Sequence, residues 1–333
     1  MAKVRILSID GGGMKGIITA MVLQRIEELL KEYSKNPDAA ISDYFELVGG
    51  TSTGAIITAL LLCADENQRP KYSPKDVVEL YKTYGKEIFH KRRFYPINTL
   101  FGLFGSKHTI ASFKEILESY FGELTMNDLL KDSVYTAYDT NKRQAVFFST
   151  VTKGKEKVES LLVRDVVLAS TAAPTYFPPV HIDNRTISHN CYVDGGIVAN
   201  NPALCLMVES LKMPEHSELC DTMLLSMGNV SSPEFYPYKK VKRWGYFGWA
   251  VPLLNILLDG SDETAEYQVD KIFRACHIMH QYLRVELQTD RRVPGMDAIS
   301  CDDLKLFEEF GYEIIHIMNP RIKTFVRRLI DYK

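Results

Sequence analysis

The chain has 333 residues, of which 46% are hydrophobic and 25% charged, and its formal net charge is -2. This composition is typical of a globular protein, and the length suits one large α/β domain or two smaller ones. A nearly neutral chain lacks the positive field of a protein built to bind a DNA or RNA polymer, which excludes that class.

The cysteines and the apolar runs indicate the compartment. The six cysteines contain no Cys-x-x-Cys pair, so we expect reduced thiols, with neither a disulfide framework nor a bound metal. No basic stretch followed by an apolar one opens the chain, so we expect no secretory signal. The longest apolar runs, 55–64 and 247–258, are too short to span a bilayer. We expect a cytoplasmic protein.

The first unit is a strand, a glycine loop and a helix. A β-branched apolar run at 4–9 predicts a parallel strand, and apolar residues at helical spacing occupy 17–30. The loop between them matches Gly-x-Gly-x-x-Gly. A dinucleotide loop would need an acidic residue at the end of a second strand, and a phosphate loop would need Gly-Lys-Ser/Thr. A loop whose N–H groups stabilise an oxyanion is the favoured interpretation.

The second unit carries a candidate nucleophile. A strand predicted at 41–49 runs into a Gly-x-Ser-x-Gly turn with Ser52 at its apex, and a buried apolar helix is expected at 55–64. The glycines of such a turn remove side chains that would clash. Because a right-handed βαβ unit brings both loops to the carboxyl edge of a parallel sheet, we expect them to form one site.

The later elements complete an α/β pattern. They are a β-hairpin at 133–138 and 144–150, an apolar helix at 161–173, a helix at 202–211 and a strand at 222–227. Beyond them we expect strands at 282–287 and 313–318 and helices around 272–279 and 324–332. The fold class is an α/β three-layer sandwich with a mostly parallel central sheet. We divide it into a catalytic domain at 1–230 and a largely helical C-terminal extension at 231–333, packed on the same core.

Two segments combine aromatic and basic residues without an acid. For 89–108, a packed irregular loop and a lid or membrane-facing segment are both open. For 236–258, a helix packed on the core competes with a surface that touches membrane or holds an anionic regulator.

Four segments, in this order, resemble the patatin-like phospholipase family. They are Asp10-Gly-Gly-Gly-Met-Lys-Gly16, Gly50-Thr-Ser-Thr-Gly54, the Ala-Ser-Thr-Ala-Ala-Pro run ending at Pro174, and Asp194-Gly-Gly196 followed by Asn-Asn-Pro202. The resemblance covers about 4–230 and implies lipid acyl hydrolysis by a Ser-Asp dyad, without metal, cofactor or histidine. It implies Ser52 as nucleophile and Asp194 as its partner. It implies an oxyanion hole and supporting glycines at Gly11, Gly12, Gly13, Gly16, Gly50, Gly54, Gly195 and Gly196.

The sequence leaves two rival site chemistries open. A Ser-His-Asp triad would take its histidine from beyond Asp194, and no motif surrounds any of the candidates His216, His277, His280 and His316. A non-enzymatic nucleotide-binding module would leave Ser52 as a bystander. We expect Asp10 to anchor its loop, and Lys15 either to be solvated or to meet a lipid phosphate.

The resemblance also implies partners. Bacterial members of this size resemble effectors of cyclic-oligonucleotide-based anti-phage signalling, which implies a cyclic di- or trinucleotide activator and a role in antiviral defence. The substrate would then be membrane phospholipid at the inner face of the membrane. The alternatives are a constitutive lipase and a toxin activated by a host protein. The chain could also form a homo-oligomer.

Overall fold

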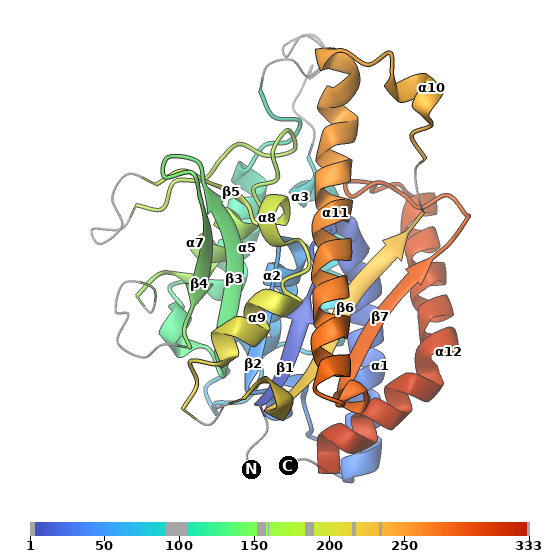
Figure 1. Cartoon of the computed structure of the whole chain (residues 1–333). Helices are drawn as coiled ribbons and strands as arrows, with labels where there is room; N and C mark the ends of the chain where they lie inside the picture. Colours follow the sequence, from blue (N-terminus) through green and yellow to red (C-terminus); the bar gives the residue numbers. More distant parts are fainter. Residues whose placement is uncertain are drawn as a thin grey trace.

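The computed structural model describes residues 4–90, 105–151, 158, 160–183, 190–214, 218–232 and 235–331. Its centre is a seven-stranded sheet in the order β4-β3-β2-β1-β6-β7, with β5 paired to β3 (Figure 1). The strands are β1 (Val4–Ile9), β2 (Leu47–Gly50), β3 (Asp132–Asp139), β4 (Gln144–Ser149), β5 (Tyr192–Asp194), β6 (Thr222–Ser231) and β7 (Tyr282–Gln288). Only β4 and β5 run antiparallel to their neighbour, which confirms a mostly parallel sheet.

Helices cover both faces of the sheet and make three layers (Figure 1). One face carries α1 (Gly16–Ser34), α2 (Thr53–Leu62), α3 (Pro74–Ile88), α5 (Ala111–Phe121), α7 (Val163–Ser170) and α12 (Cys301–Asp331). The other carries α9 (Ala203–Ser210) and α11 (Tyr246–Ala275), with α8 (Gly196–Ala199) beside α11. The short α10 (Tyr238–Val241) precedes α11. Single 3-10 turns are η1 (Gly13–Lys15), η2 (Ile41–Asp43), η3 (Met126–Asp128), η4 (Leu219–Asp221) and η5 (Met279–Gln281).

Side chains on the two faces of the sheet belong to two separate parts of the core. In β1, Leu7 and Ile9 face the layer with α1 and α2, whereas Val4 and Ile6 face the layer with α9 and α11. Successive side chains of a strand point to opposite faces, so a strand covered on both sides is apolar throughout. The continuous apolar run at 4–9 is explained in this way.

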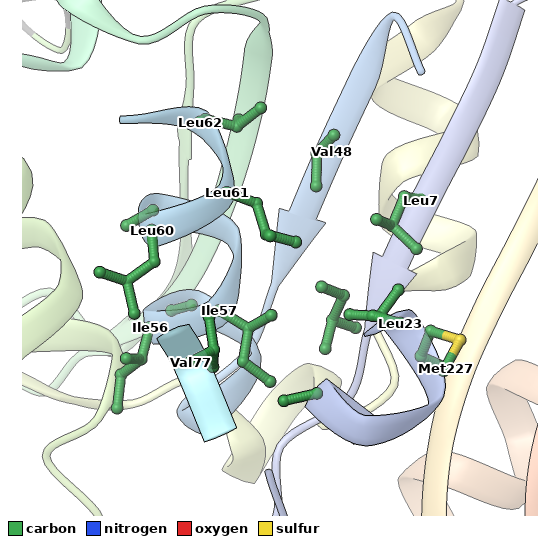
Figure 2. Close-up of a cluster of buried hydrophobic side chains, with 14 of the residues drawn as sticks. Leu7, Leu23, Val48, Ile56, Ile57, Leu60, Leu61, Leu62, Val77 and Met227 are labelled. Atoms are coloured by element: carbon green, nitrogen blue, oxygen red, sulfur yellow. The ribbon is translucent and has the colours of Figure 1, made fainter. Parts of the chain in front are cut away.

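Helix α2 is buried over its whole length, which confirms the expectation for the apolar run at 55–64. In Figure 2, Leu61 of α2 points toward β2, which carries Val48, whereas Ile56 and Leu60 lie on the opposite side of the helix, and all three belong to one core cluster with Val77 of α3. Because sheet and helices surround α2, no position on it needs a polar side chain. Because α2 is held by these neighbours, the turn at Ser52 that precedes it has a rigid base.

Three sequence predictions are corrected by the structure. The expected strand at 41–49 is only β2 at Leu47–Gly50, because η2 occupies its first part. The expected helix at 161–173 is shorter, since α7 ends at Ser170. The expected strand at 313–318 lies inside α12, whose buried residues recur at three- and four-residue spacing. A short apolar run does not distinguish a strand from one buried stripe of a helix.

Residues beyond 230 join the core of the preceding part. Strand β7 pairs with β6, α12 packs on α1, and α11 buries Val269 and Phe273 against the sheet. No helix in the described residues combines the length and hydropathy that a membrane span requires. Most of the basic-aromatic segment at 89–108, namely 91–104, lies outside the described residues, as does His216.

Candidate active site

Ser52 occupies a strained turn between β2 and α2. Its φ of 55° and ψ of -118° lie in a region that residues with a side chain rarely adopt. A Cβ at Gly50 would lie 2.2 Å from the carbonyl carbon of Gly54, and one at Gly54 would lie 2.2 Å from the Ile9 oxygen. The turn can therefore close only with glycine at both positions, and it leaves the Ser52 side chain partly exposed.

Asp194 reaches the same place through the register of the sheet. Strand β2 ends where Gly50 pairs with Tyr135 of β3, and β5 begins its pairing with β3 two residues further on, at Ala137 and Asp194. Residues of β3 that pair with β5 also pair with β4, so β5 lies on the β2 side of β3. Both β2 and β5 thus pair with the same edge of β3. Asp194 therefore lies just beyond the end of β2 that leads into Ser52.

The two side chains form one unit. The Ser52 hydroxyl lies within hydrogen-bonding reach of the Asp194 carboxylate, whose Oδ1 also accepts the Gly196 N–H at 2.7 Å. Asp194 is only 4% exposed. Burial raises the pKa of Asp194 from 3.8 to about 6, while the hydrogen bonds from Ser52 and Gly196 act to lower it. A carboxylate with this pKa is a stronger base than an exposed one and is still ionised at neutral pH.

The small-residue run at the end of α7 holds both members of this pair. The Ser52 N–H donates to Ser170 Oγ at 3.1 Å, and the Asp194 N–H donates to the Ala172 oxygen at 3.0 Å. The hydroxyl of Thr51 bonds both Thr136 Oγ1 and the Ala199 oxygen, at 2.7 and 2.6 Å. Backbone and side-chain bonds to the end of α7, to β3 and to α8 thus fix the two loops relative to each other.

The glycine loop lies directly against Ser52. A Cβ at Gly11 would lie 3.3 Å from the Ser52 Cβ, and the Gly11 N–H donates to the Asn200 oxygen at 3.0 Å. The Gly11 amide is therefore engaged in this structure. For the amides of Gly12 and Gly13, no acceptor is found in the described part of the chain. Gly13 has a φ of +59°, which favours glycine.

Comparison with known proteins identifies the family. The family model described as Patatin-like phospholipase matches residues 7–207. This chain belongs to the patatin-like phospholipase family. Patatin-15 of Solanum tuberosum is 30% identical, over 99% of this chain and 90% of that protein. Patatin-04/09 of the same plant is 29% identical with the same coverage. Among solved structures, VipD from Legionella pneumophila aligns with 13% identity and a TM-score of 0.47, over 96% of this chain and 67% of that one.

This patatin-like phospholipase is therefore an enzyme of the lipid acyl hydrolase class. Its cavity beside Ser52 has a volume of about 580 Å³ and two unlike parts. Rings of Phe89, Phe113 and Phe177 pack at centroid distances of 5.8 and 6.0 Å in the apolar part. The residues of this part are Ile56, Ile88, Phe89, Phe113, Tyr176 and Phe177.

The other part of the cavity is acidic. Four of its carboxylates recur at helical spacing on α11, so they share one face of that helix. The acidic residues of this part are Asp10, Asp259, Asp262, Glu263, Glu266 and Glu286. Burial, followed by repulsion from Asp10, raises the pKa of Asp262 to about 8. Burial lowers the pKa of Lys15, which also lines the cavity. Among the described residues no group of His, Cys, Asp or Glu is arranged to hold a metal ion.

Asp10 anchors its loop as expected, but through a residue that the sequence did not indicate. Its Oδ2 accepts Arg284 Nη2 at 2.7 Å, and the same guanidinium donates to Ser226 Oγ and Glu286 Oε2, each at 2.9 Å. Burial raises the pKa of Asp10 to about 6 even though Arg284 opposes the shift. A lone arginine in a short strand carries no motif, so only the pairing of β6 with β7 could have revealed it.

Two further supports of the glycine loop were also missed. Asn229 Nδ2 donates to the Gly11 oxygen at 2.7 Å, and the Met14 N–H donates to the Met296 oxygen at 2.8 Å. Gly228 and Asn229 directly follow the strand predicted at 222–227, but in the structure they lie inside β6, at a shift in its register with β7. Nothing in the sequence around Met296 indicates a contact with the start of the chain.

The histidines of the rival triad lie elsewhere. His277 and His280 are exposed and come just before β7, at the amino edge of the sheet, whereas Ser52 lies at the carboxyl edge. A strand of seven residues spans about 23 Å, so both are far from the site. His316 is exposed on α12. None of the described residues that line the cavity is a histidine.

Proposed function

We propose that this patatin-like phospholipase cleaves acyl esters of membrane phospholipids with Ser52 as nucleophile and Asp194 as its base. The observation that carries the proposal is the contact between the Ser52 hydroxyl and the buried Asp194 carboxylate, whose pKa is raised to about 6. A serine hydroxyl attacks an ester efficiently only when an adjacent group accepts its proton, and this carboxylate is the group within reach.

The steps follow from the contacts of these residues. Asp194 takes the hydroxyl proton as Ser52 Oγ attacks the acyl carbonyl, and the amides of Gly12 and Gly13 stabilise the oxyanion. The proton then passes from Asp194 to the departing alkoxide, so the lyso-lipid leaves as an alcohol. Water, deprotonated by Asp194, attacks the acyl-serine, and its proton returns to Ser52 as the fatty acid is released. An ester alkoxide needs little acid assistance, so two side chains suffice.

The cavity supports a lipid substrate. Its apolar part, lined by the rings of Phe89, Phe113 and Phe177, offers an acyl chain a route away from water next to Ser52. Its acidic part faces the opposite side, towards α11. The match to a lipid substrate therefore rests on the apolar part, which suits the acyl tail.

The direct test is substitution of the pair. Ser52→Ala and Asp194→Asn should each lower fatty-acid release from phospholipid vesicles by at least about 10³-fold, because neither half of the pair acts alone. Asp165→Asn is the matched control, since burial also raises the pKa of that carboxyl but it lies outside the cavity. Full activity in either variant would refute the dyad. Labelling of Ser52 by a fluorophosphonate separates a nucleophile from a bystander in a nucleotide-binding module.

Activation by a cyclic di- or trinucleotide, with a role in antiviral defence at the inner face of the membrane, is the regulatory part of the proposal and rests on resemblance alone. The carboxylates of Asp259, Glu263 and Glu286 would repel such an anion from the cavity, so a nucleotide would bind elsewhere. Titration calorimetry with a panel of cyclic nucleotides tests this part. Absence of binding would remove it and leave a constitutive or host-protein-activated hydrolase.

A further inference from the structure

Exposed apolar side chains gather in one stretch of the chain. Seven of the thirteen large apolar side chains that are exposed in the described residues lie between 235 and 257. They are Phe235, Tyr238, Tyr246, Trp249, Leu253, Ile256 and Leu257. We call this stretch, residues 235–258, the α10–α11 surface. Concentrated exposed apolar area on a folded protein commonly marks an interaction site.

The length of α11 explains why so much of this surface is exposed among the described residues. Thirty residues of helix extend about 45 Å, roughly twice the length of β7. The second half of α11 buries Val269 and Phe273 on the sheet. The first half rises past the carboxyl ends of the strands, with α10 beside its top (Figure 1). Its side chains therefore project where no sheet can cover them.

Cations accompany the apolar side chains. Residues 235–258 contain no acidic residue, and Lys239, Lys240, Lys242 and Arg243 are all exposed. The Lys240 ammonium lies 5.8 and 6.0 Å from the ring centroids of Tyr236 and Trp244, and that of Lys242 lies 5.6 Å from the Tyr238 centroid. The rings and charges thus form one mixed layer, the combination that suits the boundary between lipid headgroups and acyl chains.

The surface is continuous with the catalytic cavity. Tyr236, Asn255 and Leu258 belong to 235–258 and also line the cavity that contains Ser52. A bilayer in contact with this surface would lie directly beside the cavity. We propose that the α10–α11 surface docks the enzyme on an anionic phospholipid bilayer, with Lys239, Lys240, Lys242 and Arg243 at the headgroup phosphates. This inference deepens the proposed function and rests on it.

Two other occupants fit the same features less well. In a second copy docked by the same surface about a two-fold axis, the four cations of one copy would face those of the other, which opposes association. A cyclic nucleotide needs rings and charges that enclose a base and its phosphates. Tyr238 and Tyr246 are instead 78% and 96% exposed, so nothing in the described residues closes over them.

The test measures vesicle binding by the full chain carrying Ser52→Ala, so that the vesicles stay intact. Lys239→Glu, Lys240→Glu, Lys242→Glu and Arg243→Glu are combined in one variant, and Tyr246→Asp with Leu257→Asp in another. The controls are Lys305→Glu with Arg321→Glu and Tyr312→Asp, which are exposed on α12. Cosedimentation uses vesicles of phosphatidylcholine alone or with 30% phosphatidylglycerol.

We expect the charge reversal to weaken binding to the anionic vesicles by about 100-fold, since each cation near such a surface contributes several-fold. The apolar variant should weaken binding to both vesicle types, and the α12 controls should bind as the parent. The inference is overturned if the parent does not bind anionic vesicles, or if the charge reversal leaves binding unchanged. It is also overturned if the variants only abolish dimers in gel filtration, or if a cyclic dinucleotide binds the surface and the vesicles do not.

Hydrolysis of a soluble short-chain ester separates the two proposals. With Ser52 intact, the charge-reversed variant should cleave p-nitrophenyl butyrate at the parent rate and lose activity only on vesicles. If the α10–α11 surface does not dock on membranes, the charge-reversed variant will keep the parent activity on both the soluble ester and the vesicles. Failure of the proposed function would appear in the parent enzyme itself, as absence of ester cleavage.

Discussion

In the proposed mechanism Asp194 combines two properties that oppose each other, since it must be ionised to accept a proton yet is buried next to Ser52. With its pKa at about 6, the carboxylate is mostly protonated in mildly acidic solution and cannot act as a base. We expect kcat/KM for a soluble ester to be constant above neutral pH and to fall about tenfold per pH unit below the pKa. Initial rates between pH 4.5 and 8 measure this, with circular dichroism to exclude unfolding. If kcat/KM fell instead with an apparent pKa near 4, burial would not raise the pKa of Asp194.

The same burial should appear in the stability of the protein. The native pKa of Asp194 is raised above the unfolded value, so its ionisation costs no stability well below pH 3.8, costs more as the pH rises from 3.8 to about 6, and has its full cost above that. We expect Asp194→Asn to raise the free energy of unfolding at pH 8 by up to about 3 kcal/mol, and by about half as much at pH 5. Urea denaturation at the two pH values measures the difference. An equal effect at both would indicate that ionisation is not the cause.

At the scale of single elements, the glycine loop depends on one left-handed residue. A Cβ at Gly13 would lie 2.2 Å from the Met296 oxygen, and its φ of +59° disfavours any side chain. Gly13→Ala should therefore displace the loop and lower kcat for a soluble ester by about 100-fold, with a smaller change in KM, because the proposed oxyanion contact would be made only in the transition state.

Gly122→Ala is the matched control for this substitution. Gly122 has a similar φ of +49°, but nothing lies within 4 Å of its added Cβ, and it does not line the cavity. The Gly122→Ala variant should lose about 1 kcal/mol of stability and keep the parent kcat. Equal losses of activity in both variants would mean that backbone strain alone, and not the loop beside Ser52, is responsible.

The buried pair of Asp10 and Arg284 ties the start of the chain to β7. Arg284→Met should lower the free energy of unfolding by about 3–5 kcal/mol, because it leaves the Asp10 carboxylate buried without its cation. Adding Asp10→Asn should recover much of this loss. Arg274→Met removes an exposed pair with Asp270 on α11 and should cost less than about 1 kcal/mol. Denaturant titrations compare the three, and equal costs for Arg284→Met and Arg274→Met would contradict a structural role for the buried pair.

Elements with a strong local pattern were predictable from the sequence. The runs at 4–9 and 55–64 are apolar throughout because sheet and helices enclose β1 and α2, and both predictions are confirmed. The run at 313–318 was misread because four apolar residues in six fit either a strand or one turn of a buried helix. Its neighbours Phe310 and Ile322 extend the helical spacing and would have decided the question over a longer window.

At the scale of the whole molecule, residues beyond 230 are part of one core. Helix α12 buries Phe307, Phe310 and Ile314, and β7 covers the edge of β6. We expect a chain truncated after Val230 to lack a cooperative unfolding transition, because it would expose this apolar area and an unpaired edge strand. A chain truncated after Asp331 should unfold like the full chain. Calorimetry distinguishes the outcomes, and a sharp transition for 1–230 would show an independent domain.

The sequence by itself determined the α/β class, the family resemblance, and Ser52 as the apex of a strained turn, since each depends on residues adjacent in the chain. Tertiary structure decided what surrounds that serine. The bond from Arg284 to Asp10 joins positions 274 residues apart, and the carboxylates of α11 enter the cavity only because that helix crosses the sheet. Asp10 and Arg284 belong to common residue types without a local motif, and the pairing of β1, β6 and β7 brings them together.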